Sequence, residues 1–413
     1  MKINIKSILD ISLIFIFYAG FQGGKYFFNN RVQELGIALA FMLFFYAASK
    51  TALIKKDIYW SWWFWSAPLL IIYIMGLSSV VFSLNADTAI LPSLFAAREF
   101  LIIILAPTLY YLFHLGYSLE RFEKIFIISL IIVLANYLFH YWRIDLVSAY
   151  FSTGYMSYLV TFDEWRGYRL KPPTFALFLL TIYALLMLFK IKNSSLLKKV
   201  GWIILLCLSG YIWFLIKARS QMATLSLALL VYPLFFLRPN RINLLLLATP
   251  IGLFLLFSLG GFLVESFMNS NGGSIRSASY SLAWEQIKQH AILGYGQSSA
   301  YSKTYQDIFG AKFFPSDLGM VGITFKYGFI GVFIYIFYNF YIVRRLMRAN
   351  WYYLYQHQHL NPLLMSLFIL LIALTINLVL NPGLAYMQGL TVASVSIALT
   401  AAYNDINKQK LSA

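Results

Sequence analysis

The chain alternates long apolar runs with short polar segments. Twelve runs approach the length that a ~30 Å hydrocarbon core requires, and they lie at 8–23, 34–49, 60–83, 99–116, 123–142, 172–190, 199–216, 220–237, 242–264, 317–343, 362–380 and 383–403. Two longer polar segments interrupt them, 143–171 before the sixth run and 265–316 before the tenth. This pattern predicts an all-α, polytopic membrane helix bundle of about 12 transmembrane helices, forming one membrane domain over residues 1–413 with two sizeable loops.

The segment 265–316 carries a predicted amphipathic helix. Gly272-Gly273 is expected to break the chain, and Ser274 is placed to cap a helix that begins near Arg276. Its apolar side chains share one face at i, i+4 and i+7, namely Tyr280, Trp284 and Ile287. Such a helix can lie on a bilayer surface or on a shoulder of the protein. We expect the segment to form the lid or floor of a site that faces an aqueous compartment.

Charge predicts the orientation of the bundle. With the N-terminus in the cytoplasm, every short inner loop is basic, as the positive-inside rule requires. Both termini are then cytoplasmic, and the loops 143–171 and 265–316 lie outside. Basic residues nevertheless gather on the outer side, often at the ends of runs: Arg98, Arg143, Arg166, Arg169, Lys171, Lys217, Arg219 and Arg276. Positive charge kept on the unfavoured side indicates an anionic ligand at the outer membrane surface.

Composition narrows the class of protein. Apolar residues make up 61% of the chain and charged residues only 11%, which excludes an ordinary soluble domain. The net charge of +17 does not indicate nucleic acid here, because the basic residues lie between apolar runs, where membrane lipid and topology account for them. Cys207 is a lone cysteine, so intrachain disulfides are excluded. We find neither a phosphate-cradling Gly loop nor a Cys/His cluster, and we expect no cofactor and no metal.

Two short basic segments are candidate anion sites. Lys217-Ala218-Arg219-Ser220 forms a predicted outer turn in which Arg219 stands at a helix N-terminus. It is either a phosphate clamp or an interfacial arginine that reaches lipid headgroups. Arg166, Arg169 and Lys171 precede two prolines, and they either grip a pyrophosphate or a sugar acid or form a solvated basic loop.

Other candidate side chains have equally ordinary alternatives. Asp317 begins the tenth run and is either a helix cap or a general base for a sugar hydroxyl. Lys326 is expected deeper, facing the bundle interior or a cavity. Tyr280 and Tyr295 can stack on sugar faces, although tyrosines are also common at membrane interfaces. Arg98 either contributes to the anion site or pairs with the adjacent Glu99.

Four blocks, in order along 160–345, resemble the O-antigen ligase and O-antigen polymerase superfamily of bacterial envelope glycan assembly. They are Arg169 with Lys171-Pro172-Pro173-Thr174-Phe175-Ala176, Lys217-Ala218-Arg219-Ser220, Arg276 through Trp284 to Ile292-Leu293-Gly294-Tyr295-Gly296, and Asp317-Leu318-Gly319 through Tyr327-Gly328-Phe329-Ile330-Gly331. The earlier runs match only in number.

The resemblance implies a metal-independent glycosyltransferase of the bacterial inner membrane. A sugar hydroxyl would attack the anomeric carbon of a glycan linked to undecaprenyl pyrophosphate at the periplasmic face. By position, Arg219 and Arg276 would hold the pyrophosphate and stabilise its departure, a role that suits an always-charged guanidinium. Donor and acceptor would both be lipid-linked glycans, with a chain-length regulator as a further partner.

Two positions depart from the pattern. The ligase branch carries a His just before the run that begins here at Asp317, and this chain has none there; Ala291 also stands where many relatives have Pro. Together with the two large outer loops, the missing His favours a polysaccharide polymerase over a ligase that transfers glycan to the lipid A core. A flippase for the same lipid-linked sugar is a third possibility. A flippase should carry charges deep within many runs, whereas here they gather at the outer side.

Overall fold

The computed structural model describes residues 5–27, 31–54, 70–152, 155–163, 167–190, 196–217, 219–229, 271–298, 304–310, 313–377 and 386–412. These residues are mostly helical, as predicted. The predicted run 242–264 lies outside them.

Most predicted apolar runs coincide with helices. The N-terminal part holds α1 (Ile5–Gly20), η1 (Gly23–Tyr26), α2 (Arg31–Ile54), η2 (Ile72–Leu77), α4 (Ser78–Ala86), α5 (Ile90–Ala96), η3 (Arg98–Ile104), α6 (Leu105–His114) and α7 (Leu119–Arg143). Then follow α10 (Thr174–Lys190), α11 (Leu196–Ile216), α12 (Arg219–Leu229), α17 (Gly319–His357), α18 (Pro362–Ile376) and α19 (Met387–Ser412). Helix α17 continues well beyond the predicted end at 343.

Several of these helices could cross a membrane. Within the described residues, α2, α7, α11 and α17 are long and apolar enough, and α5 with η3–α6 makes a fifth if this pair, bent by 51°, counts as one broken span. The helices α10, α18 and α19 are apolar but shorter over the searched residues. This is compatible with a multi-pass membrane protein, and the count of twelve stays a prediction.

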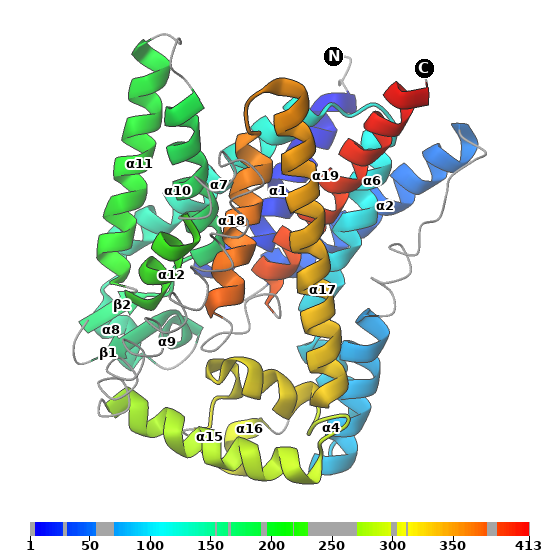
Figure 1. Cartoon of the computed structure of the whole chain (residues 1–413). Coiled ribbons are helices and arrows are strands. Elements are labelled where there is room, and N and C mark those ends of the chain that lie inside the picture. The colour runs from blue at the N-terminus through cyan, green and yellow to red at the C-terminus, as the bar shows by residue number, and fades with distance from the viewer. Residues whose placement is uncertain are drawn as a thin grey trace, which may run out of the picture.

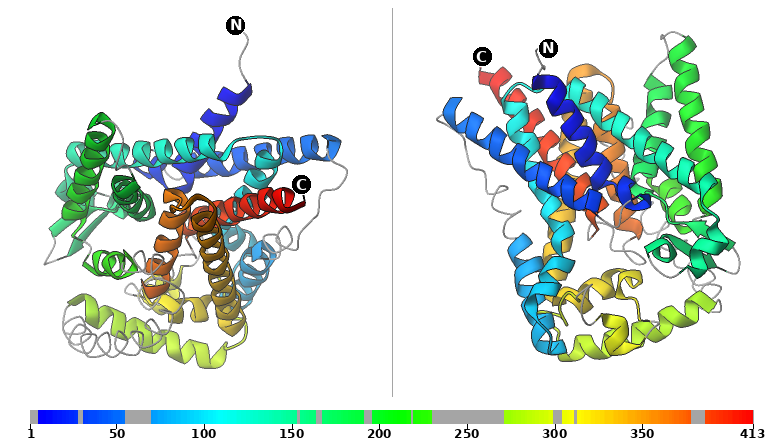
Figure 2. Two further views of the ribbon diagram at one scale, coloured as in Figure 1. Left: turned by 45° about the horizontal axis from the view of Figure 1, so that its top comes forward. Right: turned by 180° about the vertical axis from the view of Figure 1, so that it is seen from behind.

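The helices form a bundle with an additional lobe at one end (Figure 1). In the bundle, α6 packs against α19 and α2, α10 packs against α11 and α18, and α12 packs against α18. The start of α1 and the end of α19 lie at one end, and α15 (Asn271–Gln289) and α16 (Tyr305–Phe309) lie at the other, as both views in Figure 2 also show. The described residues of the predicted outer loop 265–316 therefore lie opposite the start of α1 and the end of α19.

The lobe has its own aromatic core. Buried rings from α4, α16 and α17 meet those of the connecting segments: Phe82, Tyr295, Tyr305, Phe313 and Phe325. Tyr295 stacks on Phe325 with ring centroids 5.6 Å apart. Helix α15 joins this core, packing on α17 and on η5 (Pro315–Asp317).

Helix α15 differs from the predicted amphipathic helix in two ways. It begins at Asn271 and includes Gly272-Gly273, so these glycines do not break the chain; glycine in a helix costs only about 1 kcal/mol relative to alanine. Its buried face is Ser279, Ala283 and Ile287, while Tyr280 and Trp284 are 49% and 48% exposed. The small residues at 279 and 283 allow close packing against the lobe and turn the aromatic side chains outward.

The other predicted loop, 143–171, also contains regular structure. It holds the short helices α8 (Leu146–Phe151) and α9 (Tyr155–Leu159) and an antiparallel hairpin of β1 (Val160–Asp163) and β2 (Gly167–Leu170). The all-α prediction omitted this hairpin. Thr161 pairs with Arg169 in its register, so β2 leads straight into the segment Lys171-Pro172 and then α10.

Candidate functional site

The two predicted basic segments meet at the end of α11. The Nη1 atom of Arg169, on β2, donates a hydrogen bond of 3.3 Å to the carbonyl oxygen of Ile216, the last residue of α11. Lys217 follows with φ of +51°, a left-handed conformation that ends the helix. Helix α12 begins two residues later at Arg219. The β-hairpin is thus attached to the turn between α11 and α12.

Beside these segments lies a polar cavity of about 270 Å³. Helix α12 contributes Gln221 and Thr224, the end of α18 contributes Leu374 and Asn377, and the start of α10 contributes Thr174. The remaining lining side chains come from η1 and its preceding turn, from the β2–α10 connection and from around the start of α19, and they include Gln22, Lys25, Lys171, Tyr386 and Gln388. Because α1 ends here and α19 begins here, the cavity lies at the ends of these helices that are remote from the two termini.

Lys25 is the most buried charged group of the cavity. It is 8% exposed, and its Nζ atom donates a hydrogen bond of 3.3 Å to the carbonyl oxygen of Pro172. The hydroxyl of the adjacent Tyr26 donates to the carbonyl oxygen of Lys171 at 2.6 Å. Burial, with the positive charge of Lys171 as a second cause, lowers the pKa of Lys25 from 10.5 to about 7. These two hydrogen bonds fix η1 against the β2–α10 connection.

Amide side chains complete the cavity wall. Gln388 donates from Nε2 to Oε1 of Gln22 at 3.0 Å and accepts from the backbone N–H of Phe175 at 3.1 Å. Within the described residues, Oε1 of Gln221 and Oδ1 of Asn377 are buried without a hydrogen-bond partner. Unpartnered buried acceptors are costly, and these two oxygens lie behind the surface of the cavity wall.

The electrostatics of the cavity favour an anion. Two amines, Lys25 and Lys171, are close enough for their charges to interact, and no Asp or Glu stands among the described residues that line the cavity. Amines and amide N–H groups donate to phosphate oxygens, and amide oxygens accept from hydroxyls. The site therefore suits an anionic ligand that also carries hydroxyl groups.

The third and fourth resembling blocks pack together in the lobe. The chain from Ala291 to Gly296 lies along a break in α17, where Gly328 has φ of +64°. The N–H groups of Tyr295 and Gly296 donate to the carbonyl oxygens of Phe325 and Lys326, at 2.6 and 3.0 Å. In return, the N–H of Phe329 donates to the carbonyl of Ala291 at 2.8 Å. The segment thus satisfies backbone groups that the break frees.

A hydroxyl joins the polar cavity to this second region. Tyr386, which lines the cavity, donates from its OH to the carbonyl oxygen of Ser316 at 3.0 Å. Ser316 lies in η5, next to Asp317. The backbone of the residue predicted as a cap or base is therefore close to the cavity wall.

The basic and acidic candidates differ in how much of each residue the structure describes. Arg169, Lys171 and Lys217 come together as described above, whereas Arg166 lies outside the described residues. Arg219, Arg276 and Asp317 are placed by their backbones alone, on α12, α15 and η5. Whether the guanidinium groups of Arg219 and Arg276 face a common ligand stays a prediction.

The structure places the side chains of four further candidates. Arg98 forms an ion pair of 2.8 Å with Glu34 of α2, and its charge also acts on the adjacent Glu99. The Nζ atom of Lys326 lies 5.8 Å from the ring centroid of Tyr305 in the lobe. Tyr295 is 7% exposed within the aromatic core, so its ring is covered by protein. Tyr280 is exposed on α15, the arrangement that stacking requires.

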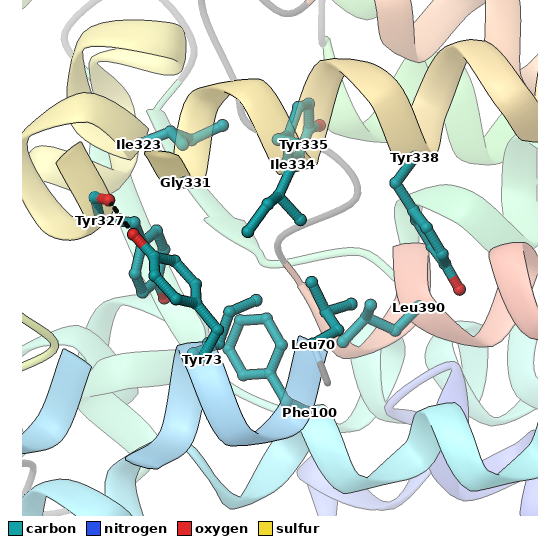
Figure 3. A pocket seen from close by; sticks show the side chains of 11 residues that line it. Leu70, Tyr73, Phe100, Ile323, Tyr327, Gly331, Ile334, Tyr335, Tyr338 and Leu390 are labelled. Carbon is teal, nitrogen blue, oxygen red and sulfur yellow. Dashed lines mark hydrogen bonds between the residues drawn. The ribbon is translucent and has the colours of Figure 1, made fainter. Parts of the chain in front are cut away.

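A second, apolar cavity of about 40 Å³ lies between η2, α17 and α19 (Figure 3). Aromatic and aliphatic side chains line it, among them Tyr73, Phe100, Tyr327, Tyr338 and Leu390. The hydroxyl of Tyr73 donates to the carbonyl oxygen of Tyr327 at 2.7 Å. Leu390 and the Gln388 of the polar cavity both belong to the first turn of α19, so an apolar and a polar cavity flank the same turn.

Sequence reasoning missed the contribution of the first and last helices. Gln22, Lys25, Tyr386 and Gln388 were not among the candidates, although Lys25 stands with the other basic residues predicted on the outer side. Their polarity at the ends of apolar runs was the available signal. Within the described residues, no three His, Cys, Asp or Glu side chains gather where they could hold a metal.

No protein-family model and no curated protein matches the chain. The site therefore rests on its own geometry and on the sequence resemblance.

Proposed function

We propose that the protein is a glycosyltransferase of the bacterial inner membrane. It extends a surface polysaccharide by joining oligosaccharide repeat units that are linked to undecaprenyl pyrophosphate, at the periplasmic face and with both termini in the cytoplasm. The observation that carries this proposal is the polar cavity with Lys25 and Lys171, at the helix ends remote from the termini. An anionic pyrophosphate with attached sugar hydroxyls matches its donors and acceptors.

The surroundings of the polar cavity support an anionic donor. The basic segments around Arg169 and Lys217 lie next to the polar cavity and add positive charge beside the departing pyrophosphate. In this proposal Arg219 and Arg276 hold the pyrophosphate, and acceptor glycan reaches the site from the aqueous side.

The experiment is a gel of surface glycan from cells with and without the protein. Loss of a polymerase leaves a single repeat unit on the lipid core, whereas loss of a ligase leaves none there and retains polymer on the carrier. Loss of a flippase also removes glycan from the core, but without periplasmic polymer. Arg219→Ala, Arg276→Ala and Lys171→Gln should each abolish or strongly shorten the polymer at unchanged protein level in the membrane.

A matched control comes from an exposed lysine at the other end of the bundle. Lys124 lies on the first turns of α7 and is exposed, so Lys124→Gln should leave the glycan ladder intact. If Arg219→Ala and Arg276→Ala still make full-length polymer, the pyrophosphate assignment is wrong. If cells that lack the protein show an unchanged ladder, the polymerase proposal is wrong.

A further inference from the structure

Lys25 stands apart from the other amines at the site because of how the fold encloses it. It lies on the short helix η1, which packs against α1, α2 and α7. Its side chain is 8% exposed and lines the polar cavity, where the carbonyl oxygen of Pro172 accepts one of its N–H groups at 3.3 Å. No carboxylate is among the described residues that line this cavity. The described wall residues thus provide no negative charge to balance a buried ammonium.

Among the groups around Lys25, the charge of Lys171 opposes its protonation, whereas the ring of Tyr26 favours the ammonium. Lys171 on the β2–α10 connection is close enough to disfavour a second positive charge. Tyr26 lies beside it, with Nζ 5.1 Å from the ring centroid, and His140 of α7 stacks on Tyr26 with centroids 5.7 Å apart. The hydroxyl of Tyr18 donates to the carbonyl oxygen of Gly23, two residues before Lys25, and Tyr386 lines the same cavity. A lysine that is desolvated beside another cation is partly unprotonated near neutral pH.

We propose that Lys25 is the general base of the transfer reaction and accepts the proton of the attacking sugar hydroxyl. This proposal rests on the proposed function. The hydrogen bond to Pro172 uses an N–H of the amine, and a neutral amine keeps its lone pair to accept a proton. The proposal gives the basic residues separate roles. Lys171 and the arginines stay charged and hold the pyrophosphate, while Lys25 contacts the hydroxyl of the acceptor glycan.

The proton transfer balances the charge that develops during the reaction. The hydroxyl oxygen forms a bond to the anomeric carbon, and its proton passes to Nζ of Lys25. The bond between that carbon and the pyrophosphate oxygen breaks, and its electron pair leaves with the lipid pyrophosphate. Lys25 becomes an ammonium while the leaving group becomes more negative, so the new charges attract each other. The ammonium then releases its proton to solvent, which restores the base.

The first test measures the protonation of Lys25 without requiring turnover. The purified full-length protein is labelled with acetic anhydride at a series of pH values, and the acetylation of each lysine is quantified by mass spectrometry. The labelling of Lys25 should reach half its maximum near pH 7, well below the pH expected for a lysine in water. If Lys25 becomes reactive only at the pH where Lys124 does, the base role is excluded.

The second test measures the rate of polymerisation by purified protein with lipid-pyrophosphate-linked repeat units. Lys25→Met should lower the maximal rate by about 10²–10⁴-fold with little change in the KM of the donor. Lys25→Arg should lower it similarly, because a guanidinium stays protonated. Retention of activity in Lys25→Arg would show that only positive charge is needed, and would overturn the proposal.

A rescue experiment separates chemistry from folding. Lys25→Cys in a Cys207→Ser background is treated with 2-bromoethylamine, since Cys207 is exposed and would otherwise react. The resulting aminoethyl thioether is a less basic amine of nearly the same length, so activity should return with a pH profile shifted to lower pH. A rescued enzyme whose profile does not move would overturn the base role.

The outcomes also distinguish the two proposals. Polymerisation that depends on Arg219 and Arg276 but not on Lys25 would overturn the base role and leave the proposed function in place. A Lys25 that titrates near neutral pH in a protein that forms no polymer would overturn the proposed function and, with it, the base role.

Discussion

Gly294 and Gly328 meet backbone to backbone across the break in α17. A Cβ atom on Gly294 would lie 2.5 Å from the backbone nitrogen of Gly328, and one on Gly328 would lie 2.6 Å from the nitrogen of Gly294. Both residues have positive φ, +75° and +64°, so neither can be replaced without steric and torsional cost. This contact joins the lobe to the helix that continues into the bundle.

The contact predicts a sharp difference between two Gly→Ala variants. Gly328→Ala should destabilise the protein by roughly 2–4 kcal/mol, because strain and overlap add. Gly210→Ala, in the middle of α11 where a Cβ would meet nothing within 4 Å, should be neutral or stabilise by up to ~1 kcal/mol. Thermal unfolding of both variants in detergent checks this. Equal stabilities would show that the break in α17 is not held by this contact.

Lys25 predicts a pH dependence of stability. Its pKa is lowered from 10.5 to about 7 in the folded protein, so between these values the unfolded chain binds a proton that the folded chain does not. The free energy of unfolding therefore rises with pH across this window, by about 1.4 kcal/mol per pH unit at most. The free energy of unfolding of the wild type, minus that of Lys25→Met, should rise in this way with pH. Below pH 7, Lys25→Met should be the more stable protein. A difference that is independent of pH would contradict the lowered pKa.

Local pattern was enough to predict the helices and not enough to predict the site. The apolar runs 123–142 and 199–216 correspond to α7 and α11 within a few residues, because span length and side-chain polarity are local properties. The sequence predicted only that Arg169 and Lys217 lie on the same side of the membrane, and not that their segments are in contact. The hydrogen bond between Gln22 and Gln388 joins residues 366 positions apart, and no local pattern indicates such a contact. For this reason Lys25 was overlooked.

The same limit explains the misplaced aromatic residues. Tyr295 follows a helix and precedes a glycine, which is typical of an exposed turn, yet Phe82, Phe309 and Phe325 from three other elements enclose its ring. On α15 the helical period was correct, but the choice of buried face depended on which residues fit against α17. Small side chains at 279 and 283 fit there, and the larger Tyr280 and Trp284 do not.

The orientation of α15 predicts which of its apolar residues maintain the lobe. Ile287 is 3% exposed in the aromatic core and Trp284 is 48% exposed. Ile287→Ala should therefore cost about 2–4 kcal/mol, while Trp284→Ala, although it removes a larger side chain, should cost less than ~1 kcal/mol. The measurement is thermal unfolding together with limited proteolysis of the lobe. A larger loss from Trp284→Ala would indicate that the originally predicted face is the buried one.

Lys171 predicts the direction in which the pH profile of catalysis moves. Its positive charge is one of the two causes that lower the pKa of Lys25, so Lys171→Gln should raise that pKa. If activity requires unprotonated Lys25, the acidic limb of the rate profile should move to higher pH in Lys171→Gln, measured on the residual activity at saturating donor. The control, Lys124→Gln, removes an equal charge from an exposed position at the far end of α7 and should leave the limb in place. An acidic limb that does not move in Lys171→Gln would show that the titrating group does not feel the charge of Lys171, and would contradict its assignment to Lys25.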